Sequence, residues 1–100
     1  MMKPTKRALI HETFGGVPYD YYPLGTYIVA APGVCGGRPT FKYTRLEVAV
    51  VLDLLATGWA VEDIIREYAQ SHVTPEAIAE AIRLAKEAFV TATTVAHSAQ

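Results

Sequence analysis

The chain has 100 residues and a formal net charge of −1, with 51% hydrophobic and 19% charged residues, a composition that is typical of one folded domain and excludes wholesale disorder. Its longest apolar run, residues 48–55, is interrupted by Asp53 and is too short to cross a bilayer, so we expect no transmembrane helix and no membrane partner. A lone Cys35 excludes an internal disulfide, and no apolar signal-peptide core follows the basic N-terminus. These features together predict a cytoplasmic protein.

Residues 1–26 are predicted to form an N-terminal arm. Turn-forming residues interrupt this segment at Gly15, Gly16, Pro18, Pro23 and Gly25. Between them stand Tyr19, Tyr21 and Tyr22. Tyrosine combines a large apolar area with a hydroxyl group and is favoured at interfaces. The three side chains are therefore candidates for a partner interface, and the alternative is that they cover the domain's own core.

Two short strands are predicted next, in a β-hairpin over residues 27–43. Residues 26–30 are β-branched and aromatic, and residues 39–43 alternate between apolar and polar types. The glycine-rich turn at Gly36 and Gly37 would join them. Two strands alone are marginally stable, so they should pack on the helices or pair with a second copy of the chain. The second option predicts a homodimer.

Three helices are predicted within a domain over residues 44–90. The first, at residues 45–56, is apolar nearly all round and should be central. The second, at residues 61–68, has a single apolar stripe, and the third begins near residue 74. Residues 91–100 contain several threonines, which weaken helix propensity, so this C-terminal tail should fray.

The ends of these helices carry recognisable capping residues. Thr44 and Glu47 have the T-x-x-E spacing of a capping box at the start of the first helix. Gly58 suits the C-terminal cap of that helix. Thr74 and Pro75 suit the N-cap and the first position of the third helix.

The turn before the second helix contains Trp59 and Ala60. A large ring at Trp59 is predicted to pack against Ile64 or Ile65 and hold the turn in place. The alternative is an exposed residue that anchors a partner. Alanine is a poor N-cap, because it has no oxygen that could accept a bond from a free backbone amide.

The predicted fold class is therefore mainly α with a small β element: an N-terminal arm and a short hairpin, followed by a three-helix, homeodomain-like helix-turn-helix domain. Residues 28–89 resemble the family known as domain of unknown function 433. The resemblance is carried by the turn from Pro32 to Pro39 with Gly37, the Thr44-Arg45 pair, Val48, Gly58, and Thr74-x-Glu76. It implies a trihelical protein of the kind often inferred to be an antitoxin paired with a nuclease-like toxin. In the family a glycine commonly precedes the Thr-Arg pair, whereas this chain has Tyr43, so the resemblance does not carry a positive φ over to this position.

Charge divides the chain into two unlike halves. Residues 1–45 carry six basic and two acidic side chains, and residues 46–100 carry three basic and eight acidic ones. A recognition helix needs basic or amide groups near its start, but the third helix begins with Glu76 and Glu80. If the chain binds DNA, we expect the contacts from Arg38, Lys42 and Arg45. The alternative for these three is a solvated face with local ion pairs.

No catalytic constellation is apparent in the sequence. His11, His72 and His97 are far apart, and none has carboxylate or cysteine neighbours at the spacing of metal ligands. Cys35 lies in a turn with no histidine near it in sequence, so it lacks the partner of a nucleophilic pair. We therefore expect a protein that is not an enzyme and needs no cofactor or metal.

Two classes of function fit these features. The first is a non-enzymatic antitoxin-type module that neutralises a nuclease-like toxin, with a partner interface formed by the tyrosines and by Glu76 and Glu80. The second is a DNA-binding helix-turn-helix regulator of transcription. A structural or assembly role remains a third alternative.

Overall fold

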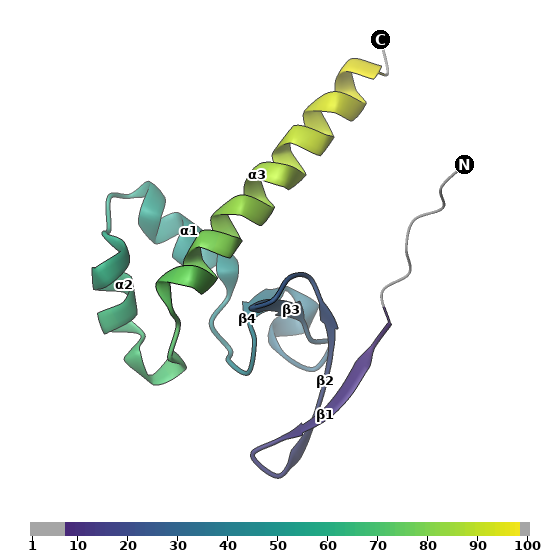
Figure 1. Cartoon of the computed structure of the whole chain (residues 1–100), viewed down its shortest axis with the longest axis vertical. Helices are drawn as coiled ribbons and strands as arrows, with labels where there is room; N and C mark the ends of the chain where they lie inside the picture. Colours follow the sequence, from purple (N-terminus) through teal and green to yellow (C-terminus); the bar gives the residue numbers. More distant parts are fainter. Residues whose placement is uncertain (1–7, 99–100) are drawn as a thin grey trace.

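A computed structural model describes residues 8–98 of the chain, with side chains for residues 8–93. A four-stranded antiparallel sheet precedes three helices (Figure 1). The strands are β1 (Ile10–Phe14), β2 (Val17–Pro23), β3 (Ile28–Ala30) and β4 (Pro39–Phe41), paired in the order β1-β2-β3-β4. The helices are α1 (Val48–Ala56), α2 (Val61–Glu67) and α3 (Pro75–Ser98), with short 3-10 turns at Cys35–Gly37 and Ala69–Ser71.

The prediction of a mainly α fold with an N-terminal arm is wrong, because residues 10–23 form the hairpin β1–β2. Gly15 and Gly16 both have positive φ, of 61° and 81°, as a tight two-residue hairpin turn requires. The pair Phe14 and Val17 flanks this turn, and the register runs back to Ile10 and Tyr21. The chain is therefore an α+β protein. Residues 1–7 of the predicted arm lie outside the described residues.

The second hairpin, β3–β4, joins the sheet to the helices. The two strands pair with each other, as the sequence predicts, and Val29 lies opposite Thr40. Tyr22 and Pro23 at the end of β2 pair with β3, so β2 contacts β1 along most of its length and β3 at its end. Figure 1 shows the β1–β2 hairpin extending away from the helices.

The first helix begins later than predicted and without the capping box. The Thr44 hydroxyl donates to the Phe41 carbonyl and accepts from the Leu46 amide, at 2.7 and 3.0 Å. The Glu47 carboxylate binds Arg38 and not the Thr44 amide, so the capping box does not form. Glu47 is itself the N-cap residue, and α1 starts at Val48.

The end of α1 is closed by glycine, as predicted. Gly58 has φ of 101°, and its amide donates to the Leu55 carbonyl at 3.1 Å. The Trp59 amide donates to the Leu54 carbonyl at 3.0 Å. These two bonds form a Schellman motif, which turns the chain directly into α2.

The third helix is capped as predicted but is longer than predicted. The Thr74 hydroxyl accepts from the Ala77 amide at 3.1 Å, and Pro75 is the first helical residue. The helix continues to Ser98, through most of the tail for which fraying is predicted, and the last two residues lie outside the described part. Among the described residues, no helix has the length and apolar character needed to cross a membrane.

One hydrophobic core lies between the sheet and the helices, and a smaller one lies on the other side of the strands. The three helices contact one another in pairs, and α1 and α3 also contact the sheet. Buried residues of the main core are Ile28, Phe41, Leu46, Val48, Val51, Ile64, Val73, Ala77, Ile78 and Ala81. The smaller cluster consists of Tyr21, Val29 and Ala31.

The start of α2 offers a stabilising substitution. Ala60 is the N-cap residue, with extended φ and ψ of −79° and 154°. A serine there would place a hydroxyl oxygen near the free amides of the first turn. We expect Ala60→Ser to raise the free energy of unfolding by about 0.5–1 kcal/mol. Urea unfolding of both chains measures this difference, and an unchanged or lower midpoint would contradict the expectation.

A buried hydroxyl in β4 offers a second stabilising substitution. Thr40 is fully buried, and no described residue forms a hydrogen bond with its Oγ1. Valine has nearly the same shape and no polar atom, and β-strands favour it. Because an unpaired buried hydroxyl costs about 1 kcal/mol or more, we expect Thr40→Val to stabilise the protein by about 1 kcal/mol in thermal or urea unfolding. Thr40→Ser, which keeps the hydroxyl and loses a methyl group, should destabilise it.

Candidate interaction surface

The turn between α1 and α2 presents a large aromatic side chain to solvent. Trp59 is 39% exposed, so its ring is not buried in the core and the alternative of an exposed residue applies to part of its surface. It lies in an open hollow of about 640 Å³, whose other lining residues are Thr57, Gly58, Asp63, Arg66 and Glu67. The Schellman motif fixes the backbone on both sides of the ring. The tryptophan is therefore held at the surface by a rigid turn.

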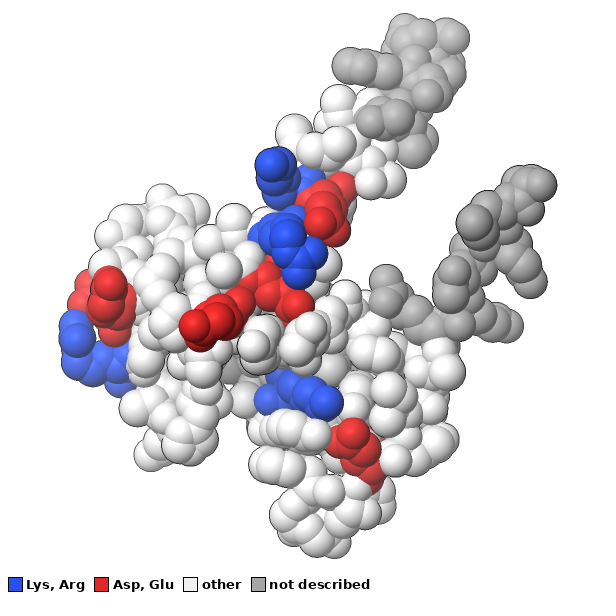
Figure 2. All heavy atoms as spheres, viewed as in Figure 1, with Lys and Arg blue, Asp and Glu red and all other residues white. Residues whose placement is uncertain are grey.

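Two acidic side chains, Asp63 and Glu67, and one basic side chain, Arg66, line this hollow. Glu62, Asp63 and Glu67 on α2 are exposed, against one basic residue, Arg66, which pairs with Asp63. Figure 2 shows both signs of charge gathered at the end of the molecule formed by α2. The net charge of the helix is negative, which suits a basic partner surface.

A second group of aromatic side chains covers the β1–β2 hairpin and is largely occupied within the chain. Tyr43 stacks on Phe14, with ring centroids 4.6 Å apart and an interplanar angle of 12°. The Tyr43 amide donates to the Tyr19 hydroxyl at 2.8 Å. The Lys42 ammonium lies 4.9 Å from the centroid of the Tyr21 ring and 5.0 Å from that of Tyr43, within cation–π range.

One carboxylate joins these aromatic groups. Glu12 accepts hydrogen bonds from the hydroxyls of Tyr43 and Tyr21, at 2.7 and 2.8 Å. These two bonds, with a smaller contribution from Lys42, lower the pKa of the Glu12 carboxyl below its usual value. The bond that the Tyr43 hydroxyl donates to Glu12 also raises the pKa of that hydroxyl. The cluster therefore ties the hairpin to the segment that follows β4.

This carboxylate should make the hairpin sensitive to acid. Because the pKa of Glu12 is lowered in the folded protein, its contribution to stability is complete above the usual carboxyl pKa of about 4.3 and is lost as pH falls through the folded value. We expect the melting temperature of Glu12→Gln to lie below that of the parent chain at pH 7 and to approach it near pH 3. A difference that stays constant over this range would exclude the role of the charge.

Two of the three basic residues proposed for DNA have partners within the chain. Arg38 donates to both carboxylate oxygens of Glu47, from Nε at 2.9 Å and from a terminal nitrogen at 3.1 Å. This pairing lowers the pKa of Glu47 and raises that of Arg38. Lys42 lies against the aromatic rings. Arg45 is exposed, and no described residue forms a hydrogen bond or ion pair with its guanidinium group.

Most of the predicted partner-interface residues are buried or half-buried. Tyr21 is 2% exposed and belongs to the smaller core, and Tyr22 is half-buried beside Ala30. Tyr19 is half-buried in the aromatic cluster. Glu76 is exposed in the first turn of α3, as an interface residue should be.

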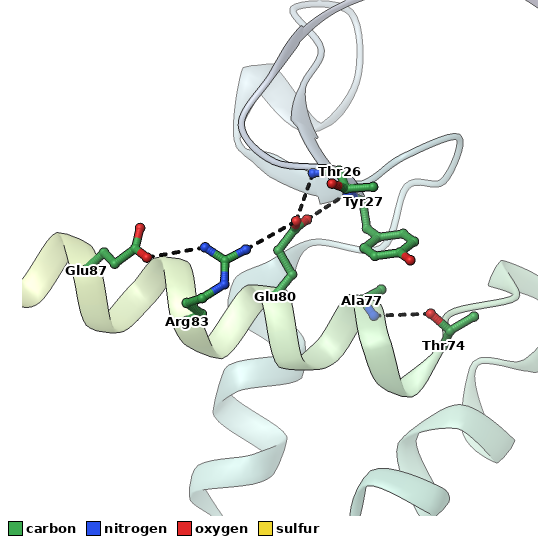
Figure 3. A network of polar contacts seen from close by, with 7 residues as sticks. All are labelled: Thr26, Tyr27, Thr74, Ala77, Glu80, Arg83 and Glu87. Atoms are coloured by element: carbon green, nitrogen blue, oxygen red, sulfur yellow. Dashed lines mark hydrogen bonds and ion pairs between the residues drawn. The ribbon is translucent and has the colours of Figure 1, made fainter.

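Glu80 was expected on the solvent side of α3, but it is only 7% exposed. Its two carboxylate oxygens accept bonds from the backbone amides of Thr26 and Tyr27, at 2.8 and 2.7 Å (Figure 3). Arg83 donates to the same carboxylate at 3.4 Å and also pairs with Glu87. Glu80 therefore fastens the loop between β2 and β3 to α3 and is unavailable to a partner.

Groups that could perform chemistry are dispersed in the described part of the chain. No three His, Cys, Asp or Glu side chains there are arranged to hold a metal ion. The His11 ring lies 3.0 Å from an oxygen of Asp20, on an exposed face of the hairpin. The Cys35 thiol donates to the Arg45 carbonyl at 3.4 Å.

Comparison with known proteins places most of this architecture in one family. The family model described as "Protein of unknown function (DUF433)" matches residues 28–85, from the start of β3 to the middle of α3. The chain belongs to the DUF433 family. No curated protein and no solved structure matches the chain. The Trp59 hollow and Glu80 lie within the family segment of this DUF433 protein, whereas the β1–β2 hairpin and the outer half of α3 lie outside it.

Proposed function

We propose that this DUF433 protein is a non-enzymatic interaction module of the antitoxin type, which binds and masks a basic, nuclease-like partner protein. The observation that carries the proposal is the exposed Trp59 in a hollow bordered by acidic side chains of α2. Tryptophan is enriched among the residues that dominate binding energy at protein interfaces. The negative charge around it complements a surface built to attract a nucleic acid.

Regulation of transcription through DNA is the second candidate, and the packing of the three helices on one another supports it. The distribution of charged side chains opposes DNA binding. The first turn of α3, which would enter the groove, carries Glu76, and α2 is acidic. Arg38 is paired with Glu47, and Lys42 lies on aromatic rings. Residues 8–93 thus offer DNA few free cations, and we rank this function below the first.

A growth assay followed by a binding assay tests the proposal. The reading frame adjacent to this gene is expressed alone and together with the chain. We expect the adjacent frame to stop growth when it is expressed alone, and growth to recover when the chain is expressed with it. The purified pair should then form a complex that Trp59→Ala weakens by at least about 30-fold, as expected for an anchor worth about 2 kcal/mol.

Matched variants separate the hollow from the rest of the surface. Tyr27 is 39% exposed, the same fraction as Trp59, but lines a different cleft, together with His72 and Thr74. Tyr27→Ala should leave the affinity unchanged, whereas Glu67→Lys should reduce it and slow association. The proposal would be refuted if the partner bound Trp59→Ala and Tyr27→Ala equally well, or if the adjacent frame were not toxic. Salt-resistant binding to a promoter fragment would favour the DNA function instead.

A further inference from the structure

Residues 85–92, in the outer half of α3, are left uncovered by the rest of the described structure. The helix has 24 residues, a length of about 36 Å. Ala77, Ile78 and Ala81 are buried in the core, but every residue from 85 to 92 is exposed, and Phe89 is 73% exposed. Figure 1 shows this part of α3 standing clear of the sheet and of the other helices. Isolated helical segments of this length are marginal in water, so an apolar face on one indicates a missing contact.

An apolar groove lies at the base of the same helix. It has a volume of about 480 Å³. Its walls come from the β2–β3 loop, α1 and α3, and its apolar lining includes Leu24, Ala49, Leu52, Leu84 and Ala88. At one end it is bordered by the ion pair of Arg38 and Glu47.

The groove and the uncovered helix share one continuous face. Ala81, Leu84, Ala85 and Ala88 line the groove and follow one another at i, i+3, i+4 and i+7, which places them on one side of α3. Ala92 continues this side outward, and Phe89 flanks it four residues after Ala85. Residues 88–98 contain no Asp, Glu, Lys or Arg. In this part of the sequence, histidine is therefore the one residue type that can carry a side-chain charge.

We propose that this face is the homodimer interface of the protein, in which the outer half of α3 of each copy lies in the groove of the other. The groove and the projecting helix belong to the same chain. In a two-fold dimer the helix of each copy therefore covers the groove of the other, and both grooves and both helices are buried. The absence of charge on residues 88–98 lets two identical stripes approach without repulsion, and small alanines allow close contact between helices. Phe89 of one copy fills the groove of the second copy beside Leu24 and Leu52. The proposed antitoxin function uses a different surface, so either proposal can fail alone.

The mass of the protein in solution tests this interface. One chain has a mass of 10.9 kDa, and light scattering with size-exclusion chromatography should give twice that value at tens of micromolar. Ala88→Glu and Phe89→Glu each place a charge on the stripe and should give the monomer mass. Val90→Glu is the matched control: it lies two residues, or about 200°, around the helix from Ala88, and it should remain a dimer. All three sites are exposed, so circular dichroism should show a folded body in each variant.

A cross-linking experiment tests the geometry directly. Two chains are prepared in a Cys35→Ser background, one with Ala49→Cys in the groove and one with Phe89→Cys on the helix. After mixing, mild oxidation should yield a disulfide between the two kinds of chain. A monomeric parent protein, a dimer that persists in both Ala88→Glu and Phe89→Glu, or the lack of the mixed disulfide would overturn the proposal.

Discussion

Replacing Glu80 with alanine is expected to lower the free energy of unfolding by about 3 kcal/mol, because each bond from a backbone amide to a buried carboxylate contributes about 1.5–3 kcal/mol. The substitution removes the acceptors of the Thr26 and Tyr27 amides. It also separates the β2–β3 loop from α3, the element that carries both the core residue Ile78 and the projecting outer half. Urea unfolding followed by tryptophan fluorescence and circular dichroism measures the loss.

Glu76 provides the matched control for Glu80. It is the same residue type, one turn earlier on the same helix, and it is exposed. Glu76→Ala should change the free energy of unfolding by less than about 0.5 kcal/mol. Glu80→Gln, which keeps one acceptor oxygen and loses the charge, should fall between the parent and Glu80→Ala. Equal effects of Glu76→Ala and Glu80→Ala would show that the two amide bonds do not contribute to stability.

The loop that Glu80 binds is shaped to receive it. A Cβ atom added at Gly25 would lie 2.6 Å from the carboxylate of Glu80, closer than atoms can approach. Gly25 is therefore required for close approach of the loop to α3. From the sequence alone, Glu80 and Arg83 fit an exposed helical pair, and that pair does exist. The amides that bury Glu80 come from residues 53 and 54 positions earlier in the chain, and a local helical pattern contains no signal for them.

Local signals did predict much of the family segment. Gly58 closes α1, Thr74 and Pro75 open α3, and β3 pairs with β4 across the glycine-rich turn. Each of these features depends on residues that are close in sequence. The capping box failed although its spacing was correct, because Arg38 nine residues earlier binds the Glu47 carboxylate.

The β1–β2 hairpin was missed, yet the sequence contained its signal. Gly15-Gly16 is a favoured two-residue hairpin turn, and the residues on both sides are rich in tyrosine and other strand formers. Pro18 and Pro23 argued against a strand. Both are tolerated here, because Pro18 lies next to the turn and Pro23 is the last residue of β2. For the candidate site, Trp59 was named but assigned to the core, because the exposure of a single ring depends on how the turn is oriented.

Tyr43 connects the hairpin to the family segment and adopts an unusual backbone conformation. Its φ is 66°, in the left-handed region that a tyrosine rarely occupies. Here the tyrosine ring stacks on Phe14, and its hydroxyl binds Glu12, both on β1. Since β1 lies outside the residues that match the family, the Tyr43 side chain links the family segment to a strand beyond it. The contacts to β1 offset the cost of the strained backbone.

Substitution of Tyr43 by alanine and by glycine separates these two effects. Tyr43→Ala keeps the positive φ and loses the ring, so we expect the melting temperature to fall by roughly 10 °C. Tyr43→Gly also loses the ring but removes the strain, and it should melt about 5 °C above Tyr43→Ala. At an ordinary position the order is reversed, because glycine costs more backbone entropy than alanine. In both variants hydrogen exchange should accelerate in β1 and the paired part of β2, while the amides of α1 remain protected. A higher melting temperature for alanine than for glycine would show that the left-handed backbone at residue 43 is not retained, and unchanged exchange in β1 would show that the hairpin is held by other contacts.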